Sequence, residues 1–398
     1  MRICVTTEER FEKTQDGSVW TPAAMPYSFW RRYLDPFEEV QVLARVQDAT
    51  ERNPAWKRAD GERVSFAAVP YYAGLSQYAF RAWSIRRSIR RIVNPSDAVV
   101  LRVGSPIASA VGPMLRKGRP FGVELVADPY EVFAPGGVRH PMRPLLRRVL
   151  TAQLRRQCRH ASTVAYVTER HLQSRYKPGN GAFTTHYSSI ELTEESFIAE
   201  PRTYRPTSRT LRIASIGSME QPYKGFDIAI DAVAICAQRG LGLQLVLVGD
   251  GRYRRDLEQR AARLGIRSKI RFTGMLASGS PVRAELDGAD IFVLASRTEG
   301  LPRAMIEAMA RGLPCIGSDA GGIPELLFTE DMFPPEDPGA LAHKIQQIVT
   351  DTGRMNRMSE RNLTKARDYH ETKLRVRRRQ FLDALRLQTE KWMQGRSA

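Results

Sequence analysis

Short apolar runs, each followed by a polar turn and a helical segment, recur along this chain and constrain its fold more than any other feature. The runs of the first half occupy residues 3–5, 98–103, 123–126 and 163–167. A buried parallel strand shows such an unbroken apolar run, because helices cover both faces of its sheet. The repeated order of strand, turn and helix is typical of an open α/β sheet. We therefore expect an α/β fold.

The pattern is interrupted once, near the middle of the chain. Residues 193–209 are polar, contain Pro201 and Pro206, and show no apolar period, which favours a linker. Beyond it, apolar runs return at residues 211–216, 243–248, 270–272, 291–294 and 314–317. We predict α/β domains at 1–195 and 210–370, a linker at 196–209, and a final helix at 371–398. A cleft between two such domains is the natural ligand site.

The charge balance indicates anionic partners. The 398 residues include 61 Lys and Arg against 43 Asp and Glu, which gives a formal net charge of +18. Only ten of the cations are Lys, so almost all of the positive charge is carried by guanidinium groups. Nucleic acid, lipid headgroups and phosphorylated substrates are the partners that such an excess favours.

The cysteines and the hydropathy pattern indicate the compartment. Cys4, Cys158, Cys236 and Cys315 are scattered without metal-site spacing, so we expect reduced thiols and no zinc site. No apolar stretch approaches the roughly 18 residues of a membrane-spanning helix. The first residues lack the layout of a signal peptide. We expect a cytoplasmic protein that can still lie on the inner face of the cell membrane.

Two basic stretches of the first half leave an alternative open. Apolar residues within 75–92 follow a 3,4,3,4,3 spacing, which predicts one helical stripe, and the same segment carries five Arg. Residues 139–159 contain seven Arg and no acidic residue, interleaved with Leu and Val. Both stretches fit ordinary surface helices with solvated basic faces. They equally fit helices held at an anionic membrane surface.

The most informative segment begins at Glu299 and runs EGLPRAMIEAMARGLPCIGSDAGGIPELL. We predict a strand at 291–294, a turn, and a helix that begins at Pro302 and is ended by Gly312. The first-turn amides of a helix have no intrahelical partner, and the macrodipole concentrates positive potential there. An anionic group such as a diphosphate suits this helix terminus.

Two carboxylates flank the predicted anion site. Glu299 precedes the helix, and Glu307 can reach back toward its beginning because helical side chains lean toward the N-terminus. Two acids beside an anion repel it unless they bind another part of the ligand, and vicinal sugar hydroxyls are suitable donors to a carboxylate. A lone glutamate on a helix is usually solvated, but the neighbours of Glu307 are apolar, which favours the binding role.

This segment resembles the donor-binding motif of retaining glycosyltransferases of the GT-B fold, family 4 type. The resemblance rests on Glu-x7-Glu and on AMARGLPCIGSDAGGIPEL, and it extends upstream through ADIFVLASRTEG, VLVGDGRYRRDL and IGSMEQPYKGFDIAIDAV. It covers most of residues 211–330, and the first half is similar only loosely. It implies two Rossmann-like domains facing each other across a cleft. The first would bind the acceptor, the second the nucleotide sugar, and the final helix would cross back to the first.

The resemblance also implies roles for individual residues. Glu299 would contact the donor sugar as a catalytic residue, and Glu307 would contact the nucleotide ribose. Backbone amides at Gly300 and Leu301 would hold sugar hydroxyls or phosphate oxygens. Lys224, in the sequence YKG, would bind the departing diphosphate, where a cation stabilises the charge that grows in the transition state.

Four further positions are candidates with weaker support. Gly17 would allow the backbone of the first domain to approach the donor phosphate. Asp128 either lines the sugar or acceptor pocket as a third catalytic residue or caps a turn before Pro129. Ser218 lies where the family commonly has an Arg, so the second phosphate contact is unassigned. Gly249 belongs to a tight GDG turn near the donor cleft.

The implied activity is transfer of a hexose, with retention, from a nucleotide diphosphate sugar to a glycan or lipid-linked acceptor, in surface polysaccharide or glycolipid synthesis. The sugar nucleotide is a co-substrate, and we expect no cofactor and no required metal. An anionic membrane surface is an expected partner. Another GT-B enzyme, such as a sugar-nucleotide epimerase, is the alternative. A basic nucleic-acid-binding protein is a remote one, since no recognised nucleic-acid module is present.

Overall fold

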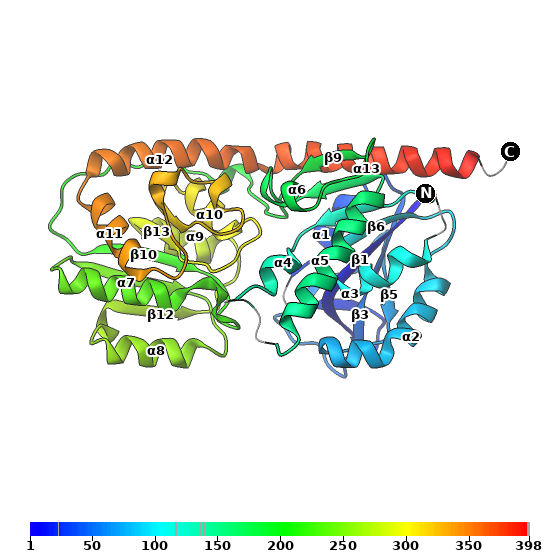
Figure 1. The fold of residues 1–398 in the computed structure, drawn as a ribbon, viewed down its shortest axis with the longest axis horizontal. Helices are drawn as coiled ribbons and strands as arrows, with labels where there is room; N and C mark the ends of the chain where they lie inside the picture. Colours follow the sequence, from blue (N-terminus) through cyan, green and yellow to red (C-terminus); the bar gives the residue numbers. More distant parts are fainter. Residues whose placement is uncertain (23, 116–117, 136, 138–139, 396–398) are drawn as a thin grey trace. The chain divides into compact units, whose positions relative to one another are not determined.

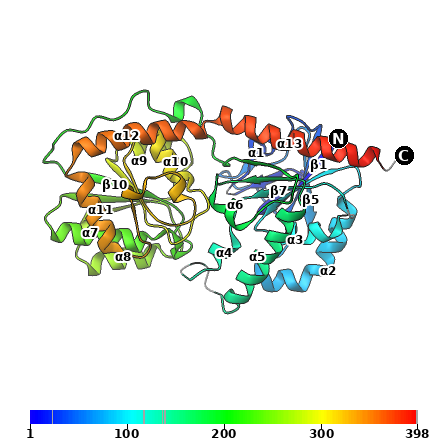
Figure 2. The same cartoon turned by 45° about the horizontal axis from the view of Figure 1, so that its top comes forward.

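The computed structural model describes residues 1–398 except 23, 116–117, 136, 138–139 and 396–398. Arg139, counted above in the second basic stretch, therefore lies outside the described residues. The chain folds into two compact units (Figures 1 and 2). The first unit comprises Met1–Asp128, Val149–Tyr187 and Arg375–Ala398, and the second comprises Pro129–Arg148 and Ser188–Leu374.

The first unit is built on one sheet of nine strands within the described residues. Seven of them are parallel: β1 (Arg2–Lys13), β3 (Glu39–Asp48), β5 (Val64–Val69), β6 (Ala98–Val103), β7 (Gly122–Leu125), β8 (Thr163–Tyr166) and β9 (Phe183–His186). Two short antiparallel strands are added at the C-terminal end of β1: β2 (Val19–Thr21) pairs with β1, and β4 (Lys57–Arg58) pairs with β2. All residues of β6, β7 and β8 are buried, as expected for parallel strands covered on both faces.

The helices of the first unit are α1 (Tyr27–Trp30), α2 (Gly74–Ile92), α3 (Pro106–Val111), α6 (His171–Arg175), and parts of α5 (Arg143–His160) and α13 (Glu371–Gln394). Helix α13, predicted as the final helix, continues into this unit from Arg375 and packs close to β7. A Cβ atom at Gly122 would lie 2.9 Å from Phe381 and 3.2 Å from Leu385. The absence of a side chain at Gly122 therefore allows the helix to approach the sheet.

A polar cluster inside the first unit lies beneath this helix. The Glu124 carboxylate accepts hydrogen bonds from Tyr33 (2.8 Å) and Tyr187 (2.7 Å) and pairs with Arg102. Burial raises the pKa of both tyrosines, so their hydroxyls stay protonated and donate. The ring of Tyr187 contacts Phe381 of α13. The buried carboxylate is thus fully hydrogen-bonded, as burial of a charge requires.

The second unit contains a parallel sheet in the order β12-β11-β10-β13-β14-β15. The strands are β10 (Leu211–Ile216), β11 (Leu243–Val248), β12 (Ile270–Gly274), β13 (Ile291–Leu294), β14 (Cys315–Ser318) and β15 (Met332–Phe333). The chain winds outward from β10 in one direction and then from β13 in the other. The strand order therefore reverses between β10 and β13, and ligands of open α/β sheets bind at such a switch point.

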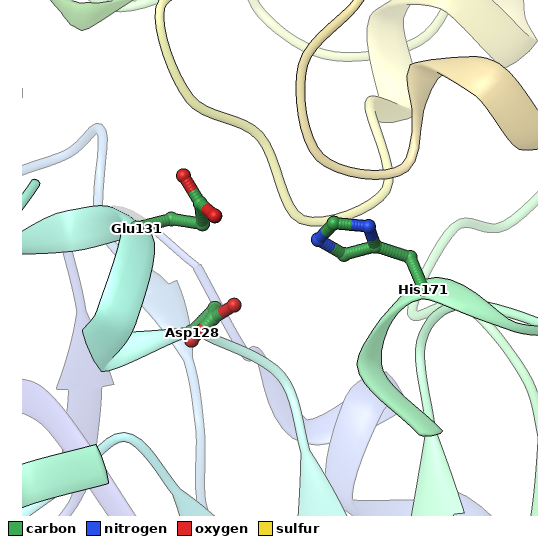
Figure 3. Close-up of side chains that lie close together, drawn as sticks. All are labelled: Asp128, Glu131 and His171. Carbon is green, nitrogen blue, oxygen red and sulfur yellow. The ribbon is translucent and has the colours of Figure 1, made fainter. Parts of the chain in front are cut away.

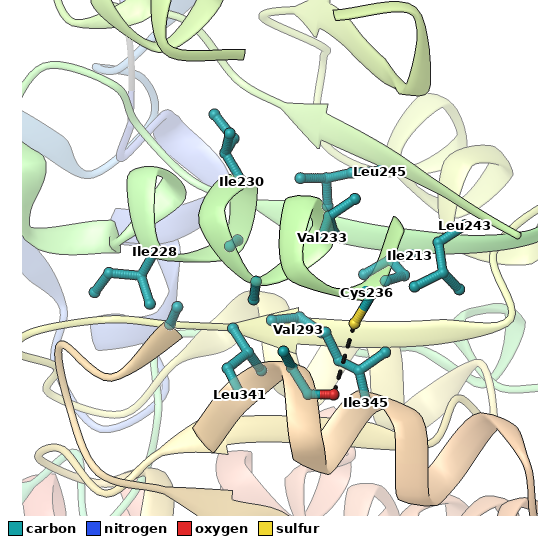
Figure 4. Close-up of a cluster of buried hydrophobic side chains, with 14 of the residues drawn as sticks. Ile213, Ile228, Ile230, Val233, Cys236, Leu243, Leu245, Val293, Leu341 and Ile345 are labelled. Atoms are coloured by element: carbon teal, nitrogen blue, oxygen red, sulfur yellow. Dashed lines mark hydrogen bonds between the residues drawn. The ribbon is translucent and has the colours of Figure 1, made fainter. Parts of the chain in front are cut away.

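Helices of the second unit are α4 (Pro129–Val132), α7 (Phe226–Gln238), α8 (Arg254–Arg263), α9 (Ser280–Asp287), α10 (Arg303–Ala310), α11 (Pro338–Val349) and α12 (Thr352–Ala366). Figure 4 shows the core where α7 and α11 pack on β10, β11 and β13 through side chains such as Ile213, Val233 and Leu341. The Cys236 thiol donates to the Ala342 carbonyl at 3.6 Å. Burial raises the pKa of Cys236 to about 11, so the thiol remains protonated. All four cysteines are buried free thiols.

Residues 196–209, predicted as a linker, lie within the second unit. Apart from the end of a short 3-10 helix at Glu194–Ser196, they form no regular element. The Arg202 guanidinium donates to the carbonyls of Leu286 (3.0 Å), Ala289 (2.6 Å) and Arg311 (2.7 Å). These carbonyls lie at or near the ends of α9 and α10, where helices leave acceptors unsatisfied. The stretch is therefore fastened to the second unit, and the chain passes between units after Asp128, Arg148, Tyr187 and Leu374.

None of the described helices is both long enough and apolar enough to cross a membrane.

Candidate functional site

The candidate site lies in the second unit, at the carboxyl ends of the strands that meet at the switch point. Lys224 ends the short 3-10 helix Pro222–Lys224, which follows β10, and Glu299 lies in the turn after β13. Gly225 explains how the two turns meet. It has φ of +66°, and a Cβ atom there would lie 1.8 Å from the Ala295 carbonyl oxygen. Only glycine tolerates both the conformation and the approach.

Lys224 and Glu299, two predicted catalytic residues, form an ion pair. The Lys224 Nζ atom lies 2.5 Å from Glu299 Oε1, and the Ser296 hydroxyl donates to the same oxygen at 2.8 Å. The side chains are 17% and 8% exposed, so the pair is shielded from solvent yet reachable. In the absence of a ligand, each group neutralises the other. A ligand with both an anion and hydroxyls could separate them and engage each one.

Arg297 holds the turn that carries Lys224, a role that the sequence analysis missed. Its guanidinium forms two hydrogen bonds with the Asp227 carboxylate, at 2.9 and 2.8 Å, and donates to the Pro222 carbonyl at 2.7 Å. Its amide donates to the Tyr223 carbonyl at 2.7 Å. These bonds raise the pKa of Arg297 above its ordinary value and tie the turn after β13 to Pro222–Lys224. An arginine after a strand is too common a signal to have been singled out.

Glu307 lies one turn inside α10, half-buried among apolar neighbours. Its carboxylate makes no hydrogen bond or ion pair within the described part of the chain. Burial raises the pKa of Glu307, and the positive charges of Arg303 and Arg283 oppose that rise. A shielded carboxylate without a protein donor is costly, so such groups usually have a partner. Ligand hydroxyls would supply the missing donors.

The beginning of α10 offers backbone donors beside these acids. The helix spans Arg303–Ala310, and Pro302 occupies its N-cap position. Among the described residues, the amides of Gly300 and Leu301 donate to no protein acceptor. The Gly300 carbonyl accepts from the Gly322 amide at 2.8 Å, which fixes this turn against the loop after β14. The predicted helix terminus is therefore present, next to the Lys224–Glu299 pair, and its binding of an anion stays a prediction.

Gly249 and Ser218 both lie near this region but act locally. Gly249 has φ of +138°, and a Cβ atom there would lie 1.9 Å from the Gly217 carbonyl oxygen, so glycine permits the turns after β10 and β11 to touch. The Ser218 hydroxyl accepts from the Glu220 amide at 3.2 Å. Ser218 therefore stabilises its own turn, and the second phosphate contact stays unassigned.

Gly17 lies in the first unit, in the exposed turn between β1 and β2. Its φ of +84° explains why a glycine occurs there. The Asp16 carboxylate accepts from the Thr14 hydroxyl (2.5 Å), the Ser18 amide (3.1 Å) and the Ser18 hydroxyl (2.9 Å), and these bonds lower its pKa. The local bonds account for the turn, and the proposed approach to a phosphate stays a prediction.

Asp128 is buried just after β7, where the Tyr176 hydroxyl donates to one carboxylate oxygen and Arg175 pairs with the other. Both partners belong to the same unit. Figure 3 shows Asp128 with His171, the first residue of α6, and with Glu131, which is counted with the second unit. The contacts favour the structural alternative for Asp128, because both oxygens already have protein partners.

A carboxylate oxygen of Asp128 and a ring nitrogen of His171 lie within 4.8 Å of each other, close enough to share a cation. The Asp128 oxygens, however, are engaged by a guanidinium and a phenol, which leaves them little capacity for a metal. We therefore assign these residues no metal-binding role.

Comparison with known proteins places this geometry in context. Residues 210–351 match the family model described as glycosyl transferases group 1. Protein CapJ of Staphylococcus aureus is 23% identical over 354 residues, covering 88% of this chain and 86% of CapJ. A putative colanic acid biosynthesis glycosyltransferase of Escherichia coli, WcaL, is 31% identical over 163 residues, covering 38% of this chain and 40% of WcaL.

Two solved structures are similar over almost the whole chain. Sucrose-phosphate synthase from Thermosynechococcus elongatus has a TM-score of 0.70 at 17% identity, covering 97% of this chain and 99% of its own. HepE from Anabaena, solved in complex with UDP and glucose, has a TM-score of 0.67 at 17% identity, with coverage of 96% and 100%. At such identities the likeness establishes the fold alone. The expected GT-B fold is confirmed.

Proposed function

We propose that the protein transfers a sugar from a nucleotide diphosphate sugar to a glycan or lipid-linked acceptor, because residues 210–351 match the family model of group 1 glycosyl transferases. The observation that carries the proposal is the Lys224–Glu299 pair beside the free amides that precede α10, with Glu307 one turn inside the same helix. One cation, two acids and a helix terminus match the parts of such a donor: diphosphate, sugar and ribose.

Lys224 and Glu299 would each exchange a protein partner for a part of the donor, and Glu307 would gain a partner. Lys224 leaves Glu299 and pairs with the diphosphate, with Gly300 and Leu301 donating from the backbone. Glu299, released from Lys224, accepts from hydroxyls of the sugar. Glu307 accepts from the ribose hydroxyls. The charge that develops on the departing diphosphate is stabilised by Lys224 and the α10 terminus, which are in place before the reaction.

We propose that transfer is of a hexose and proceeds with retention, as in the family 4 type that the motif resembles. The acceptor hydroxyl would then approach the face from which the diphosphate leaves. The first unit would bind the acceptor. We expect no divalent cation to be required, because Lys224 and the backbone amides neutralise the leaving group, and activity in the presence of a chelator tests this.

A second cation near the diphosphate would compensate for Ser218. Arg303 is the candidate, since it is exposed at the first position of α10 and acts electrostatically on Glu307. A cation at a helix N-terminus opposes the macrodipole, by about 0.3–1 kcal/mol. A bound diphosphate would make the position of Arg303 favourable, because the guanidinium would then lie beside an anion.

The place of the reaction is proposed from the relatives. WcaL is named for colanic acid biosynthesis, which supports a role in surface polysaccharide or glycolipid synthesis. A cytoplasmic enzyme acting on lipid-linked acceptors would work at the inner face of the membrane. The net charge of +18 would favour its attachment to anionic lipids.

The test is a donor screen. The purified protein is incubated with UDP-, GDP- and ADP-sugars, with and without acceptor lipids, and release of nucleotide diphosphate is measured. We expect release from one donor class and its loss in Lys224→Ala and Glu307→Ala. Near-normal turnover in both variants would overturn the site, and conversion of the donor to another sugar nucleotide without acceptor would indicate an epimerase.

A further inference from the structure

The outward side of α2 in the first unit carries two bulky aromatic side chains that are largely exposed to solvent. Phe80 is 90% exposed and Trp83 is 71% exposed. Arg87, Arg90 and Arg91 are exposed on the same helix. We call these five residues the outward face of α2. An exposed apolar cluster rimmed by charge generally marks an interaction site.

The spacing of the sequence places these residues on one side. Ile85 and Ile89 are buried, with Tyr78 and Ala82 partly buried, which defines the inner stripe of α2. Positions 80, 83, 87, 90 and 91 recur at intervals of three and four on the opposite side. The inner stripe packs against α3 and β5. The core of the unit therefore makes no use of Phe80 or Trp83.

The charges of this helix lack acidic partners. Helix α2 has five arginines and no Asp or Glu. None of the five forms an ion pair within the described residues. Arg87 instead lies over the Trp83 ring at 5.4 Å. Many arginines elsewhere are paired, as Arg260 is with Asp231 and Arg297 with Asp227. The outward face of α2 is thus an uncompensated cationic surface with aromatic groups within it.

Helix α5 adds to the same layer of helices. Within the first unit, Gln153 and Gln157 of α5 donate to the carbonyls of Ser109 (3.4 Å) and Ala108 (3.2 Å) in α3, so both α2 and α5 pack against α3 (Figures 1 and 2). Val149 of α5 is 51% exposed, and Arg155, Arg156 and Arg159 are exposed as well.

We propose that the outward face of α2 docks the first unit on an anionic lipid bilayer, with Phe80 and Trp83 inserted at the headgroup level and the arginines beside lipid phosphates. Aromatic rings prefer this zone, because one part of the bilayer interface is apolar and the other is wet. Guanidinium groups there are attracted by the negative surface potential of the anionic lipids. The inference rests on the proposed function, in which an anionic membrane is a partner, and it identifies the surface of the first unit that binds that membrane.

Vesicle sedimentation tests the docking surface. The full chain is mixed with phosphatidylcholine vesicles, with or without phosphatidylglycerol, at about 0.1 M salt. We expect binding to the anionic vesicles and its loss at about 1 M salt, where the Debye length falls to about 3 Å. Arg87→Gln with Arg90→Gln should lower the partition coefficient about 25-fold, at about fivefold per charge. Phe80→Ala with Trp83→Ala should lower it about tenfold.

Matched variants in the second unit control for net charge and for lost apolar surface. Arg255→Gln with Arg263→Gln removes two exposed arginines from α8, which also contains acids. Phe328→Ala removes an aromatic side chain that is 60% exposed. These controls should keep most of the binding. Equal losses in the controls, or full binding by the α2 variants, would overturn the proposal.

The same proteins separate this inference from the proposed function. Lys224→Ala should bind vesicles normally although it is inactive, and the α2 variants should release nucleotide diphosphate from a soluble donor at the normal rate. Absence of vesicle binding, with self-association that Trp83→Ala abolishes, would assign the outward face of α2 to a second copy of the chain and overturn lipid docking.

Discussion

The two units differ in how their candidate residues are arranged. In the second unit, residues 75 positions apart in sequence meet: Lys224 pairs with Glu299, and Glu307 lies on the helix that follows. In the first unit, Gly17 is exposed in a hairpin turn and Asp128 is buried in an ion pair. Both bonds to Glu299, from Lys224 and Ser296, reach the same oxygen, and Glu307 has no partner in the described part of the chain, whereas both oxygens of Asp128 are engaged. Ligand sites are therefore better recognised by polar atoms that lack a protein hydrogen-bond partner than by residue type.

The largest expected effect is that of Lys224→Ala, which sharpens the comparison by removing the cation from the second unit. The variant should lose at least about a thousandfold in turnover, because the leaving diphosphate loses its main counter-charge. Donor turnover and thermal unfolding are measured together. Lys269→Ala, at an exposed position of the same unit, is the control and should be near normal. An active Lys224→Ala enzyme would show that the pair with Glu299 is only structural.

The second effect is that of Glu307→Gln, which should raise the donor KM about a hundredfold because two ribose hydroxyls lose a charged acceptor. The pKa of Glu307 is raised in the folded protein by burial, so the native state bears a cost whenever the carboxylate is charged. That cost is present above the raised pKa and disappears as the carboxyl protonates on acidification. Thermal unfolding should therefore show Glu307→Gln as more stable than the parent at pH 8, with a smaller difference at pH 5.

A variant that loses donor affinity while gaining stability would identify Glu307 as a residue kept for binding. Loss of stability at both pH values would contradict this and make Glu307 part of the fold.

The third effect is that of Arg297→Ala. We expect this variant to lower donor turnover about ten- to a hundredfold, mainly through kcat. Arg297 touches no part of the proposed donor but fixes the turn that places Lys224. Arg297→Lys keeps the charge and loses the forked contact to Asp227, so it should recover only part of the activity. A large rise in KM with kcat unchanged would instead indicate that Arg297 binds the donor directly.

The sequence predicted the second unit better than the first for physical reasons. The motif from Glu299 lies on one strand, one turn and one helix, so local rules of helix termini and side-chain direction were enough to place Glu307 and the free amides. The pairing of Lys224 with Glu299 depends on the approach of Gly225 to Ala295, which is set by the order of the strands. No local pattern contains that information, and the role of Arg297 was missed for the same reason.

The first unit was misjudged where backbone pairing decides the structure. The charged stretch 8–15 suggests a loop from its sequence, but residues 8–13 continue β1 because β3 pairs with them beyond an irregularity between Thr6 and Arg10. Glu8 tolerates this position because the hydroxyls of Tyr72 (2.5 Å) and Ser105 (3.0 Å) donate to its carboxylate. Such partners are distant in sequence. In the second unit, the stretch 196–209, predicted as a linker from its lack of apolar period, is held in place by polar bonds through Arg202.

The smallest effect on catalysis is expected for Asp128→Asn, the variant that could break the comparison. If both oxygens of Asp128 serve the fold, the substitution leaves the Arg175 charge without its partner and costs about 3–5 kcal/mol of stability, while kcat per folded molecule stays within about threefold. The triple variant Asp128→Leu with Arg175→Leu and Tyr176→Phe distinguishes the roles, because replacing all partners of a buried ion pair by apolar groups is often neutral, whereas a buried Tyr176 hydroxyl left without its acceptor would itself cost stability. It should recover stability and keep turnover if Asp128 is structural. A stable triple variant without turnover would make Asp128 a catalytic residue, and the first unit would then carry part of the chemistry.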